Sequence, residues 1–391
     1  MPPALAHDPP ATCHNVTVTG DITTYIESFD SEPGYLDWAA FGPLSPNVRS
    51  EVHADAELLG TGRRSSVDLV NEHVDQSRDH AASVLGVPAE QIVIQPSTSH
   101  GLQQAIYGLR GTLLLSRAEY PALTIAAARA EAALGTMRAG WLDPENGFMT
   151  PDAVRDALTD EVTAIAVSLV DFRTGYRVDL SALRDVIGDR LLIVDAIQGL
   201  GIVDADYGAA DVVCANGYKW LRAGRGTGVA AYSPRAVDRL TPVLSGYAGV
   251  ADGLPVDEVP EPSRDARAFI VSKADSLAAA RLGSALHEIH EVGVATIAAA
   301  VEARATRVIE IADENAVSVI TPRESERRAG IVTLAPEPQD AAPLAAALAN
   351  AGVTITPRGG TIRVSAHAGT DDESLALFAA TLSAYVASRA W

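Results

Sequence analysis

The sequence is short of cysteine and of long apolar runs. Its 391 residues include two cysteines, Cys13 and Cys214, which are too few for a disulfide framework or a cysteine-rich zinc site. No apolar stretch approaches the roughly 20 residues that a membrane-spanning helix needs. Residues 1–11 lack the basic and apolar regions of a signal peptide. These absences predict a soluble, cytoplasmic protein.

Positive charge is also scarce. The chain has 30 lysine and arginine residues against 50 aspartate and glutamate residues, which gives a formal net charge of −20 at pH 7. Phosphate-rich polymers and anionic bilayers repel such a chain. We therefore expect no nucleic-acid partner and no membrane partner.

Lysine itself is nearly absent, since Lys219 and Lys273 are the only two in the chain. Codon bias explains most of this preference for arginine. A lineage with that bias still needs lysine where arginine cannot serve, and a primary amine that forms an imine is one such need. The two lysines are therefore candidates for chemistry.

Short β-rich runs alternate with helical patterns from about residue 21 to residue 245. Strands alternating with helices predict a mostly parallel sheet covered on both faces. The expected strands of this part are 92–95, 112–115, 162–167, 191–195, 212–214 and 229–232.

The second part of the chain has a different pattern. Residues 246–268 are rich in glycine, proline and acids and are expected to form a loop. A long alanine-rich helical pattern over 273–311, interrupted near Gly293, leads to a smaller α+β unit with expected strands at 317–320, 331–334, 353–356 and 361–365. The sequence thus predicts a loose arm at 1–20, a large domain at 21–250 and a small domain at 251–391.

An acid stands at the end of one expected strand. Residues 191–195 read as a buried strand, and Asp195 lies at its carboxyl end, where open α/β sheets bind ligands. A buried unpaired carboxylate is costly. Taken alone, Asp195 either pairs with a ligand group or caps the following turn.

A lysine follows another expected strand. Lys219 lies in the turn NGYKW (216–220), flanked by two aromatic residues. Together Lys219 and Asp195 suggest pyridoxal 5′-phosphate, with the lysine in a Schiff base and the acid paired with the pyridinium nitrogen.

The segment PSTSHG (96–101) follows the strand at 92–95 and opens a helical pattern. Hydroxyl groups and free backbone N–H groups at a helix N-terminus bind anions. The same residues also suit ordinary N-capping. A phosphate site here would place one cofactor between three strand ends.

These motifs, in this order, resemble the class V aminotransferase family of fold-type-I pyridoxal-phosphate enzymes, which includes cysteine desulfurases, kynureninase and isopenicillin N epimerase-like proteins. The resemblance covers residues 35–385, from YLDWAAFGP (35–43) to TIRVSAH (361–367). It implies an α/β fold with a mostly parallel seven-stranded sheet in a large domain, a smaller C-terminal α+β domain, and a homodimer.

The resemblance implies contacts with the cofactor ring. Lys219 would bind the cofactor covalently and carry the α-proton of the substrate, and Asp195 would keep the pyridine nitrogen protonated. Gln198 would hydrogen-bond the phenolic oxygen, and Tyr120 would stack on the ring.

The resemblance also implies contacts with the phosphate and the substrate. Thr98, Ser99 and Tyr218 would bind the phosphate, and Arg363 would bind the substrate carboxylate bidentately. It leaves the roles of His100 and Asp171 open.

No metal site is expected. His287 and His290 share one helical face, but they lack a third ligand and are assigned to a solvated surface.

The positions of the cysteines limit which reactions of the family this chain can catalyse. Persulfide-forming desulfurases of the family need a cysteine before the arginine strand, and this chain has none after Cys214. The sequence therefore favours C–S lyase or β-elimination chemistry on a small α-amino acid. Aminotransferase chemistry, epimerisation as in isopenicillin N epimerase, and a non-catalytic binding protein of this fold are the alternatives.

Overall fold

The structure is a computed structural model that describes residues 21–251 and 257–389. The predicted arm at 1–20 and Cys13 lie outside the described residues. No helix of the described part is both long and apolar enough to cross a bilayer.

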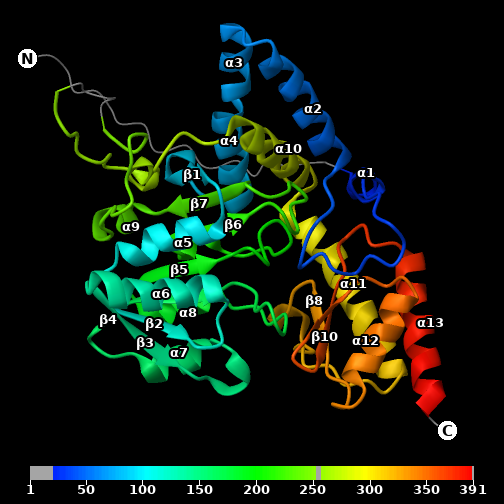
Figure 1. Ribbon diagram of the computed structural model, residues 1–391. Helices are drawn as coiled ribbons and strands as arrows, with labels where there is room; N and C mark the ends of the chain where they lie inside the picture. Colours follow the sequence, from blue (N-terminus) through cyan, green and yellow to red (C-terminus); the bar gives the residue numbers. More distant parts are fainter. Residues whose placement is uncertain (1–20, 252–256, 390–391) are drawn as a thin grey trace, which may run out of the picture.

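A seven-stranded sheet forms the centre of the larger part of the molecule (Figure 1). Its strand order is β1-β7-β6-β5-β4-β2-β3. β7 runs antiparallel to both of its neighbours, whereas the other adjacent pairs are parallel. The strands are β1 (Ile92–Gln95), β2 (Gly111–Ser116), β3 (Met137–Leu142), β4 (Val162–Ser168), β5 (Leu191–Asp195), β6 (Val212–Asn216) and β7 (Gly228–Tyr232).

Helices cover both faces of this sheet because its strands are apolar on both sides. In β5, Leu191 and Ile193 enter one core while Leu192 and Val194 enter the other, as the two-residue period of a strand requires. The first core is closed by α5 (Thr98–Tyr107) and α6 (Pro121–Leu134). The second is closed by α4 (His73–Leu85), α7 (Pro151–Ala157), α8 (Leu180–Ile187) and α10 (Ser276–Val292).

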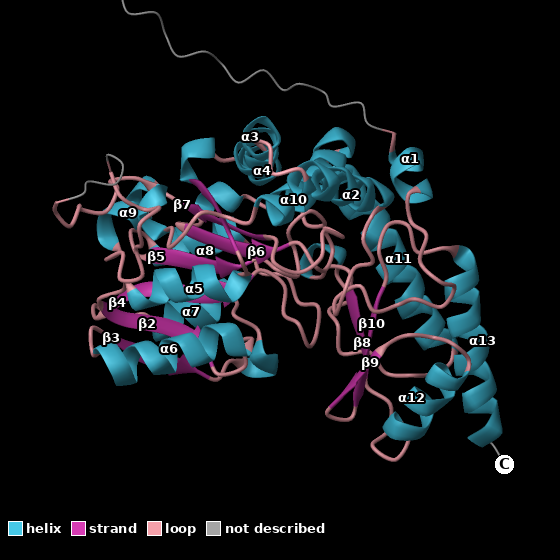
Figure 2. Cartoon of the chain, turned by 45° about the horizontal axis from the view of Figure 1, so that its top comes forward, coloured by secondary structure: helices cyan, strands magenta, loops and turns pink. Residues whose placement is uncertain are grey.

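A smaller antiparallel sheet lies beside the large one (Figure 2). It has the order β8-β10-β9, with β8 (Ile331–Leu334), β9 (Thr356–Arg358) and β10 (Thr361–Ser365). Its core is shared with α11 (Val294–Glu314), α12 (Ala341–Asn350) and α13 (Asp372–Arg389). The remaining helices are α1 (Ile22–Glu27), α2 (Pro46–Gly60), α3 (Arg64–Asn71) and α9 (Pro234–Arg239).

The fold class predicted from the sequence is confirmed. The break in the long helical pattern falls at Gly293, whose φ of 86° ends α10 before α11 begins. The domain boundary at 250/251 stays a prediction.

The observed strands differ from the expected ones in three places. β3 was missed because it is an edge strand that contains Arg138 and Gly140 and is only partly buried. Residues 317–320 form no regular strand, because the Thr321 hydroxyl accepts the N–H of Thr333 that a regular ladder would use. β9 also starts at Thr356, three residues later than the expected strand at 353–356.

Candidate active site

The predicted site residues gather where the parallel strands end. Asp195 is the last residue of β5, Lys219 follows β6, and Tyr120 is the N-cap residue of α6 after β2. The Lys219 amine nitrogen lies 5.8 Å from the centre of the Tyr120 ring and 5.6 Å from that of Tyr218. The topology therefore brings together residues that are about 100 positions apart in the chain.

Lys219 has the properties of a nucleophilic amine. It is only 6% exposed. Burial lowers the pKa of its ammonium group to about 8, although Asp195 opposes the shift. The neutral amine, which is the form that attacks a carbonyl, is therefore far more abundant near neutral pH than in an ordinary lysine.

Asp195 is a buried acid with few partners of its own. It is 2% exposed, and one carboxylate oxygen, Oδ1, accepts the backbone N–H of Ile197 at 3.0 Å. Burial raises the pKa of Asp195 to about 6, while Lys219 lowers it. A buried carboxylate with a single backbone hydrogen bond is suited to a cationic pyridinium N–H, which would give it a charged hydrogen-bond donor.

The start of α5 fits a phosphate group. Ser97 caps the helix by accepting the backbone N–H of His100 at 3.2 Å. The hydroxyl of Thr98 is buried and has no hydrogen-bond partner in the described part of the chain, and Ser99 is exposed. An orphaned hydroxyl beside free backbone N–H groups at a helix N-terminus suits an anion.

Arg225 adds positive charge on this side and was not predicted from the sequence. Its guanidinium carbon lies 4.5 Å from the centre of the Tyr218 ring. Burial raises the pKa of the Tyr218 phenol, and Arg225 opposes that shift. The signal for Arg225 lay in the segment GRGTG (224–228), which forms the turn that leads into β7.

The side-chain amide of Gln198 already forms two hydrogen bonds with other residues of the chain. Its amide nitrogen donates to the carbonyl of Ala39 at 3.0 Å, and its amide oxygen accepts the indole N–H of Trp220 at 2.8 Å. One N–H of the amide is left for a ring oxygen.

The carboxylate of Asp171 forms its hydrogen bonds within its own turn. Its Oδ1 accepts the backbone N–H groups of Arg173 and Thr174, each at 2.8 Å, and its Oδ2 pairs with the Arg173 guanidinium at 2.8 Å. The carboxylate therefore shapes the turn that follows β4.

Arg363 is buried on β10 and already has one acidic partner. Its Nη2 lies 3.2 Å from Oδ1 of Asp37 and 3.2 Å from the hydroxyl of Thr356, whereas Nε has no partner among the described residues. Arg363 lines a pocket of about 350 Å³ together with Phe172 and Arg358. The guanidinium can accept a further carboxylate from this pocket.

Glu119 is a second residue that the sequence analysis missed. The hydroxyl and backbone N–H of Ser168 donate to its Oε2 at 2.5 and 3.1 Å. Burial raises the pKa of Glu119 to about 7, and Asp171 and Asp195 add to the rise. Its position between β2 and Tyr120 could have identified Glu119 as a residue near the site.

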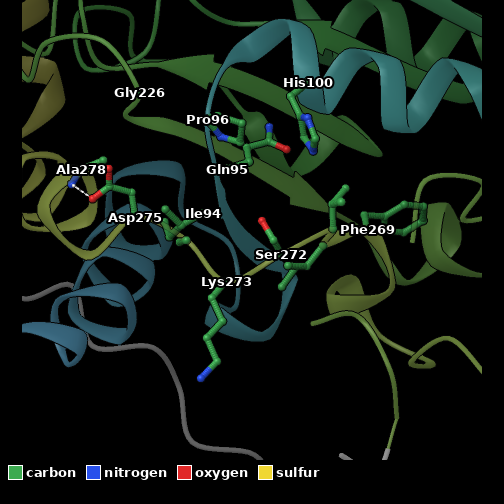
Figure 3. A pocket seen from close by; sticks show the side chains of 13 residues that line it. Ile94, Gln95, Pro96, His100, Gly226, Phe269, Ser272, Lys273, Asp275 and Ala278 are labelled. Carbon is green, nitrogen blue, oxygen red and sulfur yellow. Dashed lines mark hydrogen bonds between the residues drawn. The ribbon is translucent and has the colours of Figure 1, made fainter. Parts of the chain in front are cut away.

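His100 lines a different pocket of about 350 Å³ (Figure 3). This pocket also contains Gln95, Phe269 and Lys273, and its described lining includes neither Lys219 nor Asp195. Burial lowers the pKa of the His100 imidazole. Lys273 thus lines the Figure 3 pocket, whereas Lys219 lies in the candidate active site.

Curated proteins resemble parts of this chain. Kynureninase from Deinococcus radiodurans is 27% identical over 226 residues, which cover 55% of this chain and 53% of that protein. A protein from Mycobacterium tuberculosis named "Probable hercynylcysteine sulfoxide lyase" is 30% identical over 176 residues, 43% of this chain and 42% of that protein. The chain thus matches about half the length of these curated relatives.

Solved structures show the same fold along nearly the whole chain. The cystine C–S lyase C-DES in complex with its product cysteine persulfide has a TM-score of 0.82 at 17% identity, and the match covers 90% of this chain and 98% of that one. A mutant of C-DES has been solved with glycine covalently linked to its pyridoxal-phosphate cofactor.

Residues 34–368 match the family described as aminotransferase class-V. This match confirms the resemblance and the cofactor, pyridoxal phosphate, that the sequence suggested. The chain therefore belongs to the aminotransferase class-V family of pyridoxal-phosphate enzymes.

Proposed function

We propose that this protein cleaves a C–S bond of a small α-amino acid by β-elimination. The observation that carries the proposal is the buried, partly neutral amine of Lys219 beside the buried carboxylate of Asp195. Pyridoxal phosphate, when bound, withdraws electrons from the α-carbon of an amino acid. The side chains of this chain then select the bond that breaks.

Lys219 supplies the amine that holds the cofactor and moves a proton. With a pKa near 8, the amine can take a proton from the substrate α-carbon and return it elsewhere. Asp195 would keep the ring nitrogen protonated through a charge-assisted hydrogen bond. Thr98, Ser99 and the N–H groups at the start of α5 would hold the phosphate.

The remaining groups orient the ring and the substrate. Tyr120 would stack on the ring, Tyr218 would contact the phosphate, and the free N–H of Gln198 would bind the phenolic oxygen. Arg363, which lines the pocket beside Phe172, would bind the substrate carboxylate. These contacts would hold the α-hydrogen toward Lys219.

Elimination is favoured over persulfide transfer because no suitable thiol is present. The chain has no cysteine after Cys214, and Cys214 is buried on β6, where burial raises the pKa of its thiol. In elimination the Cα–H and Cβ–S bonds break, the sulfur leaves with its own substituent and takes up a proton, and hydrolysis of the three-carbon remainder gives pyruvate and ammonia. The similarity to a sulfoxide lyase and to the fold of a C–S lyase supports this choice.

The test is a panel of amino acids offered to the cofactor-loaded enzyme. Cysteine, cystine, a cysteine S-oxide and alanine would be incubated with it, and pyruvate, ammonia and released sulfur compounds would be measured. We expect pyruvate from at least one sulfur compound and none from alanine. An oxo acid formed from the substrate with an amino-group acceptor would indicate transamination, and loss of optical purity alone would indicate epimerisation.

The chain offers a matched control for the lysine. Lys219→Ala should abolish the visible absorption of the covalently bound cofactor together with turnover, whereas Lys273→Ala should preserve both. Turnover retained in Lys219→Ala would refute the assignment. Wild-type protein that binds no pyridoxal phosphate would support the non-catalytic alternative.

We also infer a homodimer. Four large apolar side chains are exposed among the described residues of 243–271, and exposed apolar surface is typical of interaction sites. They are Val243, Tyr247, Val259 and Val271. Sedimentation of a monomer at micromolar concentration would refute this inference. We further propose the cytoplasm as the working compartment, because the chain uses only two cysteines.

A further inference from the structure

Three side chains that bind metals in many proteins converge on the α2–α3–α4 hairpin, apart from the residues assigned to the active site (Figure 1). Glu51 and Asp55 lie one turn apart on α2, and His73 is the first residue of α4. One ligand atom from each of the three lies within 4.8 Å of the other two.

The atoms that face one another are all electron-rich. His73 Nε2 lies 3.1 Å from Oδ2 of Asp55 and 3.3 Å from Oε1 of Glu51. The other ring nitrogen, Nδ1, lies 3.1 Å from the amide oxygen of Gln76, which can only accept a hydrogen bond. Nε2 is thus the ring nitrogen that faces the two carboxylates, and it also lies 3.4 Å from Oδ1 of Asp55.

Asp55 is the buried member of the cluster. It is only 3% exposed, and His73 Nε2 lies 3.1 Å from its Oδ2 and 3.4 Å from its Oδ1. α2 has 15 residues, and only Val48 and Asp55 are buried. A buried carboxylate is costly unless it is paired, and both oxygens of this one face the His73 ring within the cluster.

We propose that Glu51, Asp55 and His73 bind a divalent transition-metal ion of the zinc type. Tetrahedral zinc with bonds of about 2.0–2.2 Å places its ligand atoms about 3.3 Å apart, which matches the two distances to Nε2. Gln76 fixes the ring through the second nitrogen, as is usual for metal-bound histidine. Three protein ligands leave a fourth position for water.

The metal ties α2 to α4 across a hairpin that has little apolar packing of its own. α3, between them, buries only Val70. α2 begins directly after the segment in which the Gly42 N–H donates to the carbonyl of Tyr218. The ion therefore stabilises a structure that continues into the wall of the active site.

Zinc titration of the metal-free, cofactor-loaded enzyme at pH 8 tests the site. We expect calorimetry to show one equivalent of Zn²⁺ bound and no comparable binding of Mg²⁺, which prefers all-oxygen sites. Asp55→Asn and His73→Gln should each weaken zinc binding by more than about a hundredfold, because loss of even an outer-shell partner costs about 10- to 100-fold. His53→Gln and Glu57→Gln, at exposed positions of the same helix, are the matched controls.

Limited proteolysis gives a second readout. The bond between Arg63 and Arg64 is exposed between α2 and α3, and zinc should slow its cleavage by trypsin in the wild type and the controls but not in Asp55→Asn. Failure of the wild type to bind zinc at pH 8 would overturn the proposal. Equal zinc affinity of wild type and Asp55→Asn would also overturn it, and His73→Gln decides the matter if Asp55→Asn does not fold.

Discussion

Replacing Arg363 by glutamine tests whether this side chain binds the carboxylate of the substrate. The guanidinium is buried, with Asp37 at 3.2 Å on one side and the pocket beside Phe172 on the other. Loss of one partner from a buried charge pair costs about 2–4 kcal/mol, which corresponds to a rise in KM of roughly 30- to 700-fold. Because the carboxylate is bound in the ground state and the transition state alike, kcat should change much less than KM.

Asp37→Asn is the matched control, and it should act in the opposite direction. The amide keeps a hydrogen-bond acceptor for Thr356, which donates to Asp37 at 2.8 Å, but removes the negative charge that competes with the substrate for Arg363. KM should therefore fall, by up to about tenfold or 1.4 kcal/mol. Initial rates of pyruvate formation, over a range of concentrations of the substrate found in the panel, measure both variants.

Two results would refute this reasoning. An unchanged KM in Arg363→Gln would show that the guanidinium does not bind the substrate. Equal increases in KM in Arg363→Gln and Asp37→Asn would show that the pair acts as a structural unit that fixes the N-terminal segment, and the double variant would then be no worse than either single one.

Three further predictions concern cofactor binding and stability. Pyridoxal phosphate should combine with the apoprotein at a rate that rises up to about pH 8 and then levels off, because only neutral Lys219 attacks; stopped-flow absorbance that is independent of pH would contradict this. The pKa of Glu119 is raised from 4.5 to about 7 in the folded chain, so its ionisation lowers stability as pH rises through that window; Glu119→Gln should therefore gain about 2 kcal/mol on the wild type at pH 8 relative to pH 5 in urea unfolding of the apoprotein, and a constant difference would refute it. Gly42→Ala should weaken cofactor binding and raise KM together, because a Cβ there would lie 1.9 Å from the carbonyl oxygen of Lys219; a variant altered in only one of the two, by spectroscopic titration and initial rates, would contradict the coupling.

The positions of the candidate site residues on the large sheet could be predicted because they depend on local sequence. Asp195 ends an apolar run and Lys219 follows another, each of which has the length of a buried strand, and the carboxyl ends of parallel strands meet at one edge. Thr98 was identifiable for the same reason, as the first residue of a helix after a strand. In each case a residue and the neighbours that define its position lie within about ten residues.

The partners of these residues could not be predicted in the same way. Asp37 and Arg363 are 326 residues apart, and Gln198 bonds Ala39 from 159 residues away. Nothing in either local sequence indicates that these groups meet. The hydrogen-bond partners of the Gln198 amide are therefore known only from the tertiary structure.

One short segment connects the small sheet with the turn that carries Lys219. Residues 35–37 bridge to the small sheet and its flanking loop at Thr354 and Ser365, and Asp37 there pairs with Arg363. Within the next five residues the same segment reaches the large sheet, where the Gly42 N–H donates to the Tyr218 carbonyl at 2.8 Å. A shift of the small sheet would therefore move this segment against the turn that carries Lys219. The fold thus sets the distance between the arginine that would bind the substrate and the amine that would react with it through one continuous stretch of backbone.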